Sequence, residues 1–503
     1  MASSPVDETS PLLRTGDDED NPRAGHGPEP LTTSRRLSIA VPCLLLMLAA
    51  EIGSNLLTVP MSQIAEGIIC RRLYPDVGSE TWEDARCKNS TVQAELSMLQ
   101  GWEITFGLIP GLVTAIPYGL LADKYGRKAI LCLSITGMIL AQITDIVIYT
   151  RPDVFALRLI WLGSLWTFLG GGPFVYSAMI YTMANDVSVE AQRSTTFLYL
   201  AAATVGAELA SGPLTYIAMR QGGAWLSVYI GLALLFIAAL LAFAFPETRQ
   251  LKVGGTNIES RNEPLDNSRP SIWARLSQGI SIVTSSTRYL FFDNITLGLL
   301  LFSLVFTTLG RYVSIILLQY TTKRFRWSWS EAGLLSSISA TVNLSLTAAI
   351  LPALSQVLMR KIRLSALAKD LVLVRTGITA LILGALGIGL ARSSITLVIG
   401  VVIYALGSGY APAMRGLLVQ MAGEEHIGTL FTAMSVLESI GVLTAGPMMA
   451  AAFRLGLGWG DAWIGLPFIL ASCLLGCAAV VVFGVSTSKP WYQQPATTTN
   501  ADS

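Results

Sequence analysis

The chain has 503 residues, of which 52% are hydrophobic and only 13% are charged, whereas about a quarter of a typical soluble domain is charged. This composition excludes an ordinary soluble protein and predicts that lipid surrounds most of the chain. The net charge of +1, without a continuous basic stripe, argues against a nucleic-acid partner. Two histidines and six cysteines without C-x-x-C spacing give no recognisable metal site, and we expect no cofactor.

The N-terminal segment 1–36 is acidic, rich in Pro and Gly, and too poor in apolar side chains to fold alone. We expect it to be a disordered cytoplasmic tail. Two sets of apolar runs follow, and each run is long enough to cross a bilayer as a helix. The first set is 37–59, 96–121, 129–149, 155–183, 195–217 and 226–245, and the second is 289–318, 332–354, 371–391, 395–421, 429–453 and 462–483.

The predicted fold is therefore an all-α polytopic membrane protein with twelve transmembrane helices in two pseudo-symmetric six-helix bundles. The bundles span 37–246 and 289–486, with a cytoplasmic linker at 247–288 and a cytoplasmic tail at 487–503. A weak internal repeat supports this division, because Phe197 precedes Gly212-Pro213 by the same spacing by which Phe431 precedes Gly446-Pro447. Such repeats are typical of transporters built by duplication.

The distribution of Lys and Arg in short loops predicts which side each loop faces. Basic residues precede the first span, follow the second and separate the eighth from the ninth, and these places share one side if both termini are cytoplasmic. They are Arg35, Arg36, Lys124, Arg127, Lys128, Arg360, Lys361, Arg363 and Lys369. Lys323, Arg324 and Arg326 fall on the opposite side and depart from the rule.

The long polar loop after the first span then faces outward, where oxidation persists. It contains Cys70 and Cys87, and we predict a disulfide between them. Closing a loop of this length is worth about 3 kcal/mol in chain-entropy models. The alternative is two free thiols. The same loop carries Asn89-Ser90-Thr91, which predicts glycosylation at Asn89.

The loop after the second predicted span reads Gly119-Leu120-Leu121-Ala122-Asp123-Lys124-Tyr125-Gly126-Arg127-Lys128. Here Gly119 permits close helix approach, Gly126 permits a tight turn, and Asp123 and Arg127 are placed to form a charge-assisted pair. A generic positively charged inner loop is the alternative. The segment resembles the loop motif G-x-L-x-D-x-x-G-R-K of the major facilitator superfamily in every fixed position, Lys128 included.

This resemblance implies an alternating-access transporter in which Asp123 holds the eleventh span, near Thr429, when the cytoplasmic side is shut. The segment Gly170-Gly171-Gly172-Pro173, followed by Asp186 and Arg193, resembles the tetracycline-resistance and proton-coupled folate transporter branch. We expect Asp186 and Arg193 to act with the loop motif in gating.

Two further segments resemble drug exporters. Gly206, Gly212 and Pro213 are similar to the exporter glycine-proline motif, although the full glycine repeat is absent. Arg158 is similar to the arginine of the exporter motif R-x-x-x-G, with the glycine, Gly163, displaced by one residue. Taken together, the resemblance covers the membrane region and is strongest to fungal exporters of small organic molecules.

Charged side chains within spans are costly and mark a path for substrate or protons. The predicted pathway comprises Glu51, Glu103, Arg158, Glu208, Arg311 and Glu438. By position in the predicted spans, Glu51, Glu208 and Glu438 are the deepest acids. The alternative for each residue is a static buried ion pair. We expect Asp145, Arg311 and Arg415 to reach water near a span end.

The tail segment Glu8-Thr9-Ser10-Pro11-Leu12-Leu13 has the form of an acidic dileucine sorting signal. Glu8, Leu12 and Leu13 would recruit a sorting adaptor and direct the protein along a vacuolar or endosomal route. The sequence alone leaves both the plasma membrane and the vacuolar membrane open as the destination.

These observations predict a proton-coupled exporter of a small organic molecule, such as a secondary metabolite or drug-like compound. The alternative is a proton symporter for uptake of an organic anion or nutrient. No nucleophile with a matching base and no P-loop is recognisable, so neither an enzyme nor an ATP-driven pump is expected. The expected partners are the lipid bilayer, the organic substrate and protons, and the expected state is a monomer.

Overall fold

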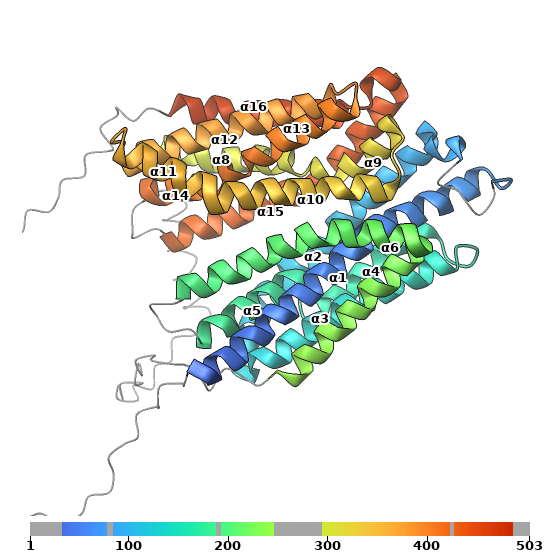
Figure 1. Ribbon diagram of the computed structural model, residues 1–503, viewed down its shortest axis with the longest axis horizontal. Helices are drawn as coiled ribbons and strands as arrows, with labels where there is room; N and C mark the ends of the chain where they lie inside the picture. The colour runs from blue at the N-terminus through green and yellow to red at the C-terminus, as the bar shows by residue number, and fades with distance from the viewer. Residues whose placement is uncertain (1–32, 78–83, 188–192, 246–293, 423–426, 486–503) are drawn as a thin grey trace, which may run out of the picture.

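The computed structural model describes residues 33–77, 84–187, 193–245, 294–422 and 427–485, which form helices and short turns without any strand. The helices divide into two groups that lie side by side, one coloured blue to green and the other yellow to red (Figure 1). The predicted linker, the C-terminal tail and nearly all of the predicted N-terminal tail, including the sorting signal, lie outside the described residues.

The first group of helices, which we call the N-half, begins at Thr33 and ends at Ala244. It consists of α1 (Thr33–Leu73), η1 (Ala85–Lys88), α2 (Ser90–Tyr125), α3 (Arg127–Thr150), η2 (Leu157–Leu159), α4 (Ile160–Gly163), η3 (Ser164–Phe168), α5 (Gly172–Val187) and α6 (Arg193–Ala244).

The second group, the C-half, begins at Ile295 and ends at Gly484. It consists of α8 (Ile295–Arg311), α9 (Ser314–Phe325), α10 (Trp329–Ser345), the π-helical turn η7 (Leu346–Ile350), α11 (Leu351–Arg360), α12 (Ala366–Gly389), α13 (Ser394–Leu406), η8 (Gly407–Gly409), α14 (Tyr410–Ala422), α15 (Ile427–Trp459), η10 (Asp461–Trp463) and α16 (Leu466–Gly484).

Eleven segments in the described part of the chain are long and apolar enough to cross a membrane. The longest is Tyr199–Ala244, with 46 residues, and a straight helix of that length would reach about 70 Å, more than twice the hydrocarbon thickness. It does not run straight, because Gly222 and Gly223 leave the helical conformation and Gly223 has a φ of 72°. This segment is therefore two spans, and the prediction of twelve is confirmed.

Two predicted boundaries are wrong in informative ways. The first span was expected to end at Val59, but α1 continues to Leu73 because the acid in its last turns finds buried hydrogen-bond partners. The fourth span was expected to be continuous, but Gly170, Gly171 and Gly172 take positive φ values of 85°, 81° and 60°. Glycine tolerates this left-handed conformation, which ends a helix, so the span is divided between α4 with η3 and α5.

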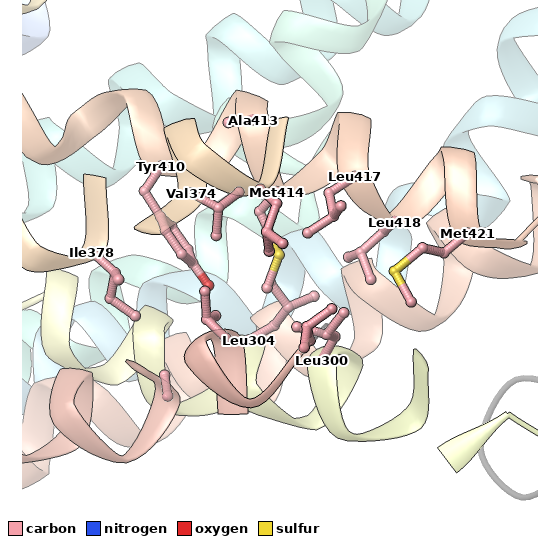
Figure 2. Packing of buried hydrophobic residues seen from close by; sticks show 14 of the residues in the cluster. Leu300, Leu304, Val374, Ile378, Tyr410, Ala413, Met414, Leu417, Leu418 and Met421 are labelled. Carbon is pink, nitrogen blue, oxygen red and sulfur yellow. The ribbon is translucent and has the colours of Figure 1, made fainter. Parts of the chain in front are cut away.

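Each half has its own core of interlocking apolar side chains. Figure 2 shows the C-half core, where Leu300 and Leu304 of α8 meet Val374 of α12 and Met414 and Leu417 of α14. The core of the N-half is built in the same way from α1, α3, α5 and α6. Between helices in lipid, such packing contacts replace the hydrophobic drive that operates in water.

The two remaining cores differ because they include residues from both halves. Trp329 and Leu318 of the C-half pack into a core formed by the ends of α1 and α2, and Ala94 of α2 packs against a core of the C-half. Both shared cores lie toward the end of the molecule that carries the Cys70 to Cys87 loop. We call this end the outer side, following the orientation predicted from the basic loops.

Candidate functional site

A cavity of about 440 Å³ lies between the halves, lined by α1, α2, α3, α6, α9 and α10. Its volume lies within the range of pockets that hold small organic ligands. Most of its polar lining consists of hydroxyl and amide groups from both halves: Ser54, Thr58, Ser62, Gln100, Gln142, Ser314, Gln319, Ser336 and Ser339. Such groups can donate and accept hydrogen bonds without fixing the charge of a substrate.

Two of the predicted pathway acids, Glu103 of α2 and Glu208 of α6, line this cavity. A third, Glu51 of α1, lies within electrostatic range of Glu208. Near Glu103, the buried Oε1 of Gln142 has no hydrogen-bond partner among the described residues. The structure thus brings two predicted acids from two helices to the lining of one cavity, with a third acid, Glu51, within electrostatic range of Glu208.

The expectation that Asp145 reaches water is wrong. Asp145 is only 7% exposed, it lies within electrostatic range of Glu103, and its Oδ1 has no hydrogen-bond partner among the described residues. The carboxylate fits because Gly163 lacks a side chain, since a Cβ there would lie 2.8 Å from Asp145 Oδ1. Gly163 and Asp145 lie on different helices, so nothing in the sequence indicated that they meet. Sequence reasoning therefore missed Asp145 as a site residue.

The other predicted pathway residues lie elsewhere. Arg158 lies in η2 at the outer side, where its NH2 is 2.8 Å from Glu95 Oε1. Arg311 is exposed at the end of α8. Glu438 is 3.3 Å from NH2 of Arg415 within the C-half. None of these side chains lines the cavity, so the predicted pathway residues do not form a single site.

The outer end of the cavity is closed by a polar network that we call the outer lock, centred on Glu66. This carboxylate is 1% exposed, and Nζ of Lys88 donates to its two oxygens at 2.7 and 2.8 Å. The Gln93 amide also donates to it. The indole Nε1 of Trp329, from the C-half, donates to Glu66 Oε2 at 2.7 Å. Four donor contacts thus satisfy a buried charge, and one of them joins the halves.

Two further side chains of the C-half complete the outer lock. Nε2 of Gln319 donates to the backbone oxygen of Gln93 at 2.6 Å and to its side-chain oxygen at 3.0 Å. Nζ of Lys323 donates to the backbone oxygen of Lys88 at 2.5 Å. Sequence reasoning missed this network, because its members come from α1, η1, α2, α9 and α10.

The predicted disulfide between Cys70 and Cys87 is present, with a Cα to Cα distance of 5.1 Å. It joins the last turn of α1 to η1 and so holds Lys88 close to Glu66. Burial lowers the pKa of the Lys88 ammonium, while the charge of Glu66 opposes that shift. Nearby, Asn89 is exposed and its Nδ2 donates to Tyr74 Oη at 2.8 Å, so the predicted glycosylation site is accessible.

The halves also meet through close backbone crossings. Gly101 of α2 faces Gly446 of α15, and a Cβ at Gly101 would lie 2.7 Å from the Gly446 oxygen. One turn further along α2, Thr105 Oγ1 donates to the Leu443 oxygen at 2.9 Å. Small residues of this kind permit helices to approach closely in membranes.

On the inner side, Gly126 turns the chain between α2 and α3 with a φ of 105°, as predicted. Arg127 forms a buried ion pair with Asp186 of α5, so two predicted gating residues meet within the N-half. The side chains of Asp123 and Arg193 lie outside the described residues, and their roles remain predictions. Gly119 was expected at a close helix contact, but no other atom would lie within 4 Å of a Cβ there.

The sequence model of the Major Facilitator Superfamily matches residues 89–368. The chain is similar to the MFS efflux pump atnC of Emericella nidulans, at 27% identity over 97% of this chain and 94% of that protein. It is also similar to the efflux pump ustT of Aspergillus flavus, at 32% identity over 84% of this chain and 83% of that protein.

Among solved structures, the inward-open xylose transporter XylE from E. coli superposes with a TM-score of 0.59 at 12% identity, over 91% of this chain and 98% of that chain. At this identity the likeness supports the fold alone. The resemblance carried by the 119–128 loop is confirmed, and the protein is a multi-pass membrane transporter rather than an enzyme. The chain belongs to the Major Facilitator Superfamily.

Proposed function

We propose that this transporter exports a small organic molecule, such as a secondary metabolite, from the cytoplasm by proton-coupled alternating access. The observation that carries the proposal is the polar cavity between the halves, lined by two carboxylates and closed at its outer end by the outer lock. Two similar fungal proteins named as efflux pumps support the direction. In this arrangement a substrate would enter from the cytoplasm and wait for the outer lock to open.

We assign proton coupling to the carboxyl groups at the cavity. Glu103 interacts electrostatically with the buried Asp145, and Glu208 with Glu51. Ionisable groups within spans are the usual carriers of coupled protons. Because Glu103 and Glu208 line the cavity directly, a bound substrate would alter their surroundings. That contact supplies a physical route from substrate binding to proton release.

Export is tested first by an untargeted comparison of metabolites in a deletion strain and an overexpressing strain. If the protein exports, at least one organic molecule accumulates inside deletion cells, and its level in the medium rises on overexpression. If instead the deletion strain leaves a compound in the medium that the parent depletes, the protein is an importer, and the proton symporter for an organic anion or nutrient takes its place.

The metabolite identified in this way then serves as the probe for coupling in proteoliposomes with an imposed pH gradient. Glu103→Gln and Glu208→Gln should abolish the response of transport to the gradient. Glu438→Gln is the matched control, because that carboxylate is paired with Arg415 away from the cavity. Unchanged gradient responses in both cavity variants would place the proton site elsewhere.

A further inference from the structure

A second cavity, which we call the outer basin, opens on the outer side beyond the outer lock and has a volume of about 710 Å³. Its cationic lining consists of Lys88, Lys323, Arg324, Arg326 and Arg392. The N-half contributes residues at η1, and the C-half contributes the turn from α9 to α10, the turn before α13, and η10. The basin therefore exists only when the two halves are together at this end.

The positive charge of the outer basin is largely uncompensated. Lys323, Arg324, Arg326 and Arg392 form no ion pair with any carboxylate in the described part of the chain. Two carboxylates also line the basin, Asp84 and Asp461.

The carboxylate of Asp84 is already occupied, because NH2 of Arg86 lies 2.7 Å from its Oδ2, and Arg86 does not line the basin. Asp461 offers its backbone oxygen to Arg324, and its carboxylate lies within electrostatic range of Lys323. Because Lys88 is paired with Glu66, the three arginines Arg324, Arg326 and Arg392 remain without a compensating carboxylate in the described part of the chain. The remaining imbalance favours a ligand that carries negative charge.

The backbone conformation at Arg326 does not explain why an arginine occupies this position. Arg326 ends α9 in the left-handed conformation, with a φ of 56°, and that position usually favours glycine or asparagine. The side chain is also exposed. An arginine here is explained neither by the turn nor by burial, whereas a guanidinium beside a cavity suits a planar oxyanion.

We infer that the outer basin binds an oxyanion, either a carboxylate or a phosphate group of a soluble molecule, and that the bound anion holds the outer lock closed. The guanidinium groups of Arg326 and Arg392 supply bidentate donors. Lys88 and Lys323 contribute both to the basin and to the outer lock. A ligand that needs residues of both halves binds the closed arrangement better and shifts the population toward it. The inference does not depend on the direction of transport.

The binding test uses the full-length purified protein in nanodiscs of neutral phosphatidylcholine, with citrate as the probe in isothermal titration calorimetry. Citrate should bind saturably, whereas sodium chloride at matched ionic strength should not. The double variant Arg326→Gln/Arg392→Gln should bind citrate at least tenfold more weakly. Arg71→Gln is the matched control, because Arg71 is exposed on the outer side and does not line the basin. Equal affinity in the double variant and the parent would overturn the inference.

Nanodiscs containing phosphatidylglycerol distinguish the two sources of an oxyanion. If the ligand is soluble, citrate should bind equally well in both lipids. If instead the anionic lipid abolishes citrate binding in the parent, and parent protein retains more phosphatidylglycerol than the double variant through purification, a lipid headgroup occupies the basin. That result would overturn the assignment to a soluble molecule.

The effect of the bound anion on the outer lock is measured with Ser62→Cys, which lies in the cavity between the halves. A membrane-impermeant maleimide added from the outer side labels this cysteine. Citrate should slow labelling in the parent background and leave it unchanged in the Arg326→Gln/Arg392→Gln background. Equal labelling rates with and without citrate in the parent, despite citrate binding, would overturn the coupling to the outer lock.

Discussion

The outer and inner ends of the molecule are built on opposite principles. At the outer end, residues of both halves share apolar cores, and the buried Glu66 accepts hydrogen bonds from both halves. Toward the inner end, each half keeps a core of its own, and the ion pair of Arg127 with Asp186 lies within the N-half. At Gly119, no other atom would lie within 4 Å of an added Cβ, which agrees with this separation.

This difference indicates which contacts must change during transport. The separate cores can remain intact while the halves rock against each other, as expected for rigid-body alternating access. In the mechanism that we propose, the outer lock comes apart in every cycle. Its bonds to Trp329, Gln319 and Lys323 are few and polar, and water can replace them when the outer end opens.

The strongest test of the outer lock is Glu66→Gln. This change leaves the ammonium of Lys88, 17% exposed, buried without its anion, which should destabilise the protein by roughly 3 to 5 kcal/mol. Thermal unfolding in nanodiscs measures the loss. The double variant Glu66→Gln/Lys88→Met removes the stranded charge and should recover stability. If the double variant is as unstable as the single one, the buried charge is not the cause.

The disulfide should have the next largest effect, because it fixes η1 against the end of α1. Cys70→Ser/Cys87→Ser should lower the unfolding free energy by about 3 kcal/mol, and urea titration of purified protein measures this. Peptide mapping without reductant should recover a linked peptide containing both cysteines. Alkylation of both thiols under those conditions would contradict the bond and the assigned topology.

Trp329→Phe tests closure, because it keeps an aromatic ring beside Lys88 and removes the indole donor to Glu66, one of the bonds that join the halves. Hydrogen bonds to charged groups contribute about 1.5 to 3 kcal/mol, so the population should shift at least tenfold toward an open outer end. Distances between spin labels on the outer ends of α1 and α10 report this. The matched control is Trp327→Phe, whose indole donates to Ser394 within the C-half at 3.2 Å. A shift of equal size in both would refute the specific role of Trp329.

On the inner side, Asp123→Asn tests whether the family motif closes the cytoplasmic end. Export of the metabolite identified above should fall strongly, while membrane insertion and the unfolding temperature stay close to those of the parent. Asp153→Asn, at a turn on the opposite side, serves as the control. Full export by Asp123→Asn would remove this residue from the gating mechanism.

The smallest effect is expected in the outer loop, where Arg86 contacts Asp76 at 2.5 Å and Asp84 at 2.7 Å. Hydrogen bonds from Arg86 lower the pKa of both carboxyls. Their contribution is therefore present above the ordinary Asp pKa of about 3.9 and is lost as the pH falls through the lowered values. The protection of the loop amides from hydrogen exchange, relative to their intrinsic exchange rates, should fall below about pH 4, and Arg86→Gln should remove that dependence. A fall that persists in this variant would point to other groups.

The sequence predicted the spans well because bilayer thickness sets the length of each apolar run. It placed the end of the first span at Val59, whereas α1 continues to Leu73 and carries Glu66 in its last turns. The partners that make Glu66 acceptable inside the protein lie 22, 27 and 263 positions away, and no local pattern encodes them. Cys70 and Cys87 were paired correctly because the topology placed both on the oxidising side, only 17 positions apart.

The candidate site was predictable only in part. The cost of a charge in lipid singled out Glu103 and Glu208, and both line the cavity between the halves. The same argument chose Arg158, which forms its ion pair at the outer side. It also placed Asp145 in water, because the space that Gly163 leaves for a carboxylate depends on how two helices face each other.

We expect the two halves to rotate about the crossing of Gly101 and Gly446. Because no side chain separates α2 from α15 at this point, the two helices can act as levers whose outer arms close while their inner arms spread. A methyl group on Gly101 would meet the Gly446 oxygen and the Ala450 Cβ at 2.7 and 2.8 Å. The added methyl group would hold α2 and α15 apart at this point. We expect it to change the fraction of time that the transporter spends open to each side of the membrane, without altering the residues that line the cavity.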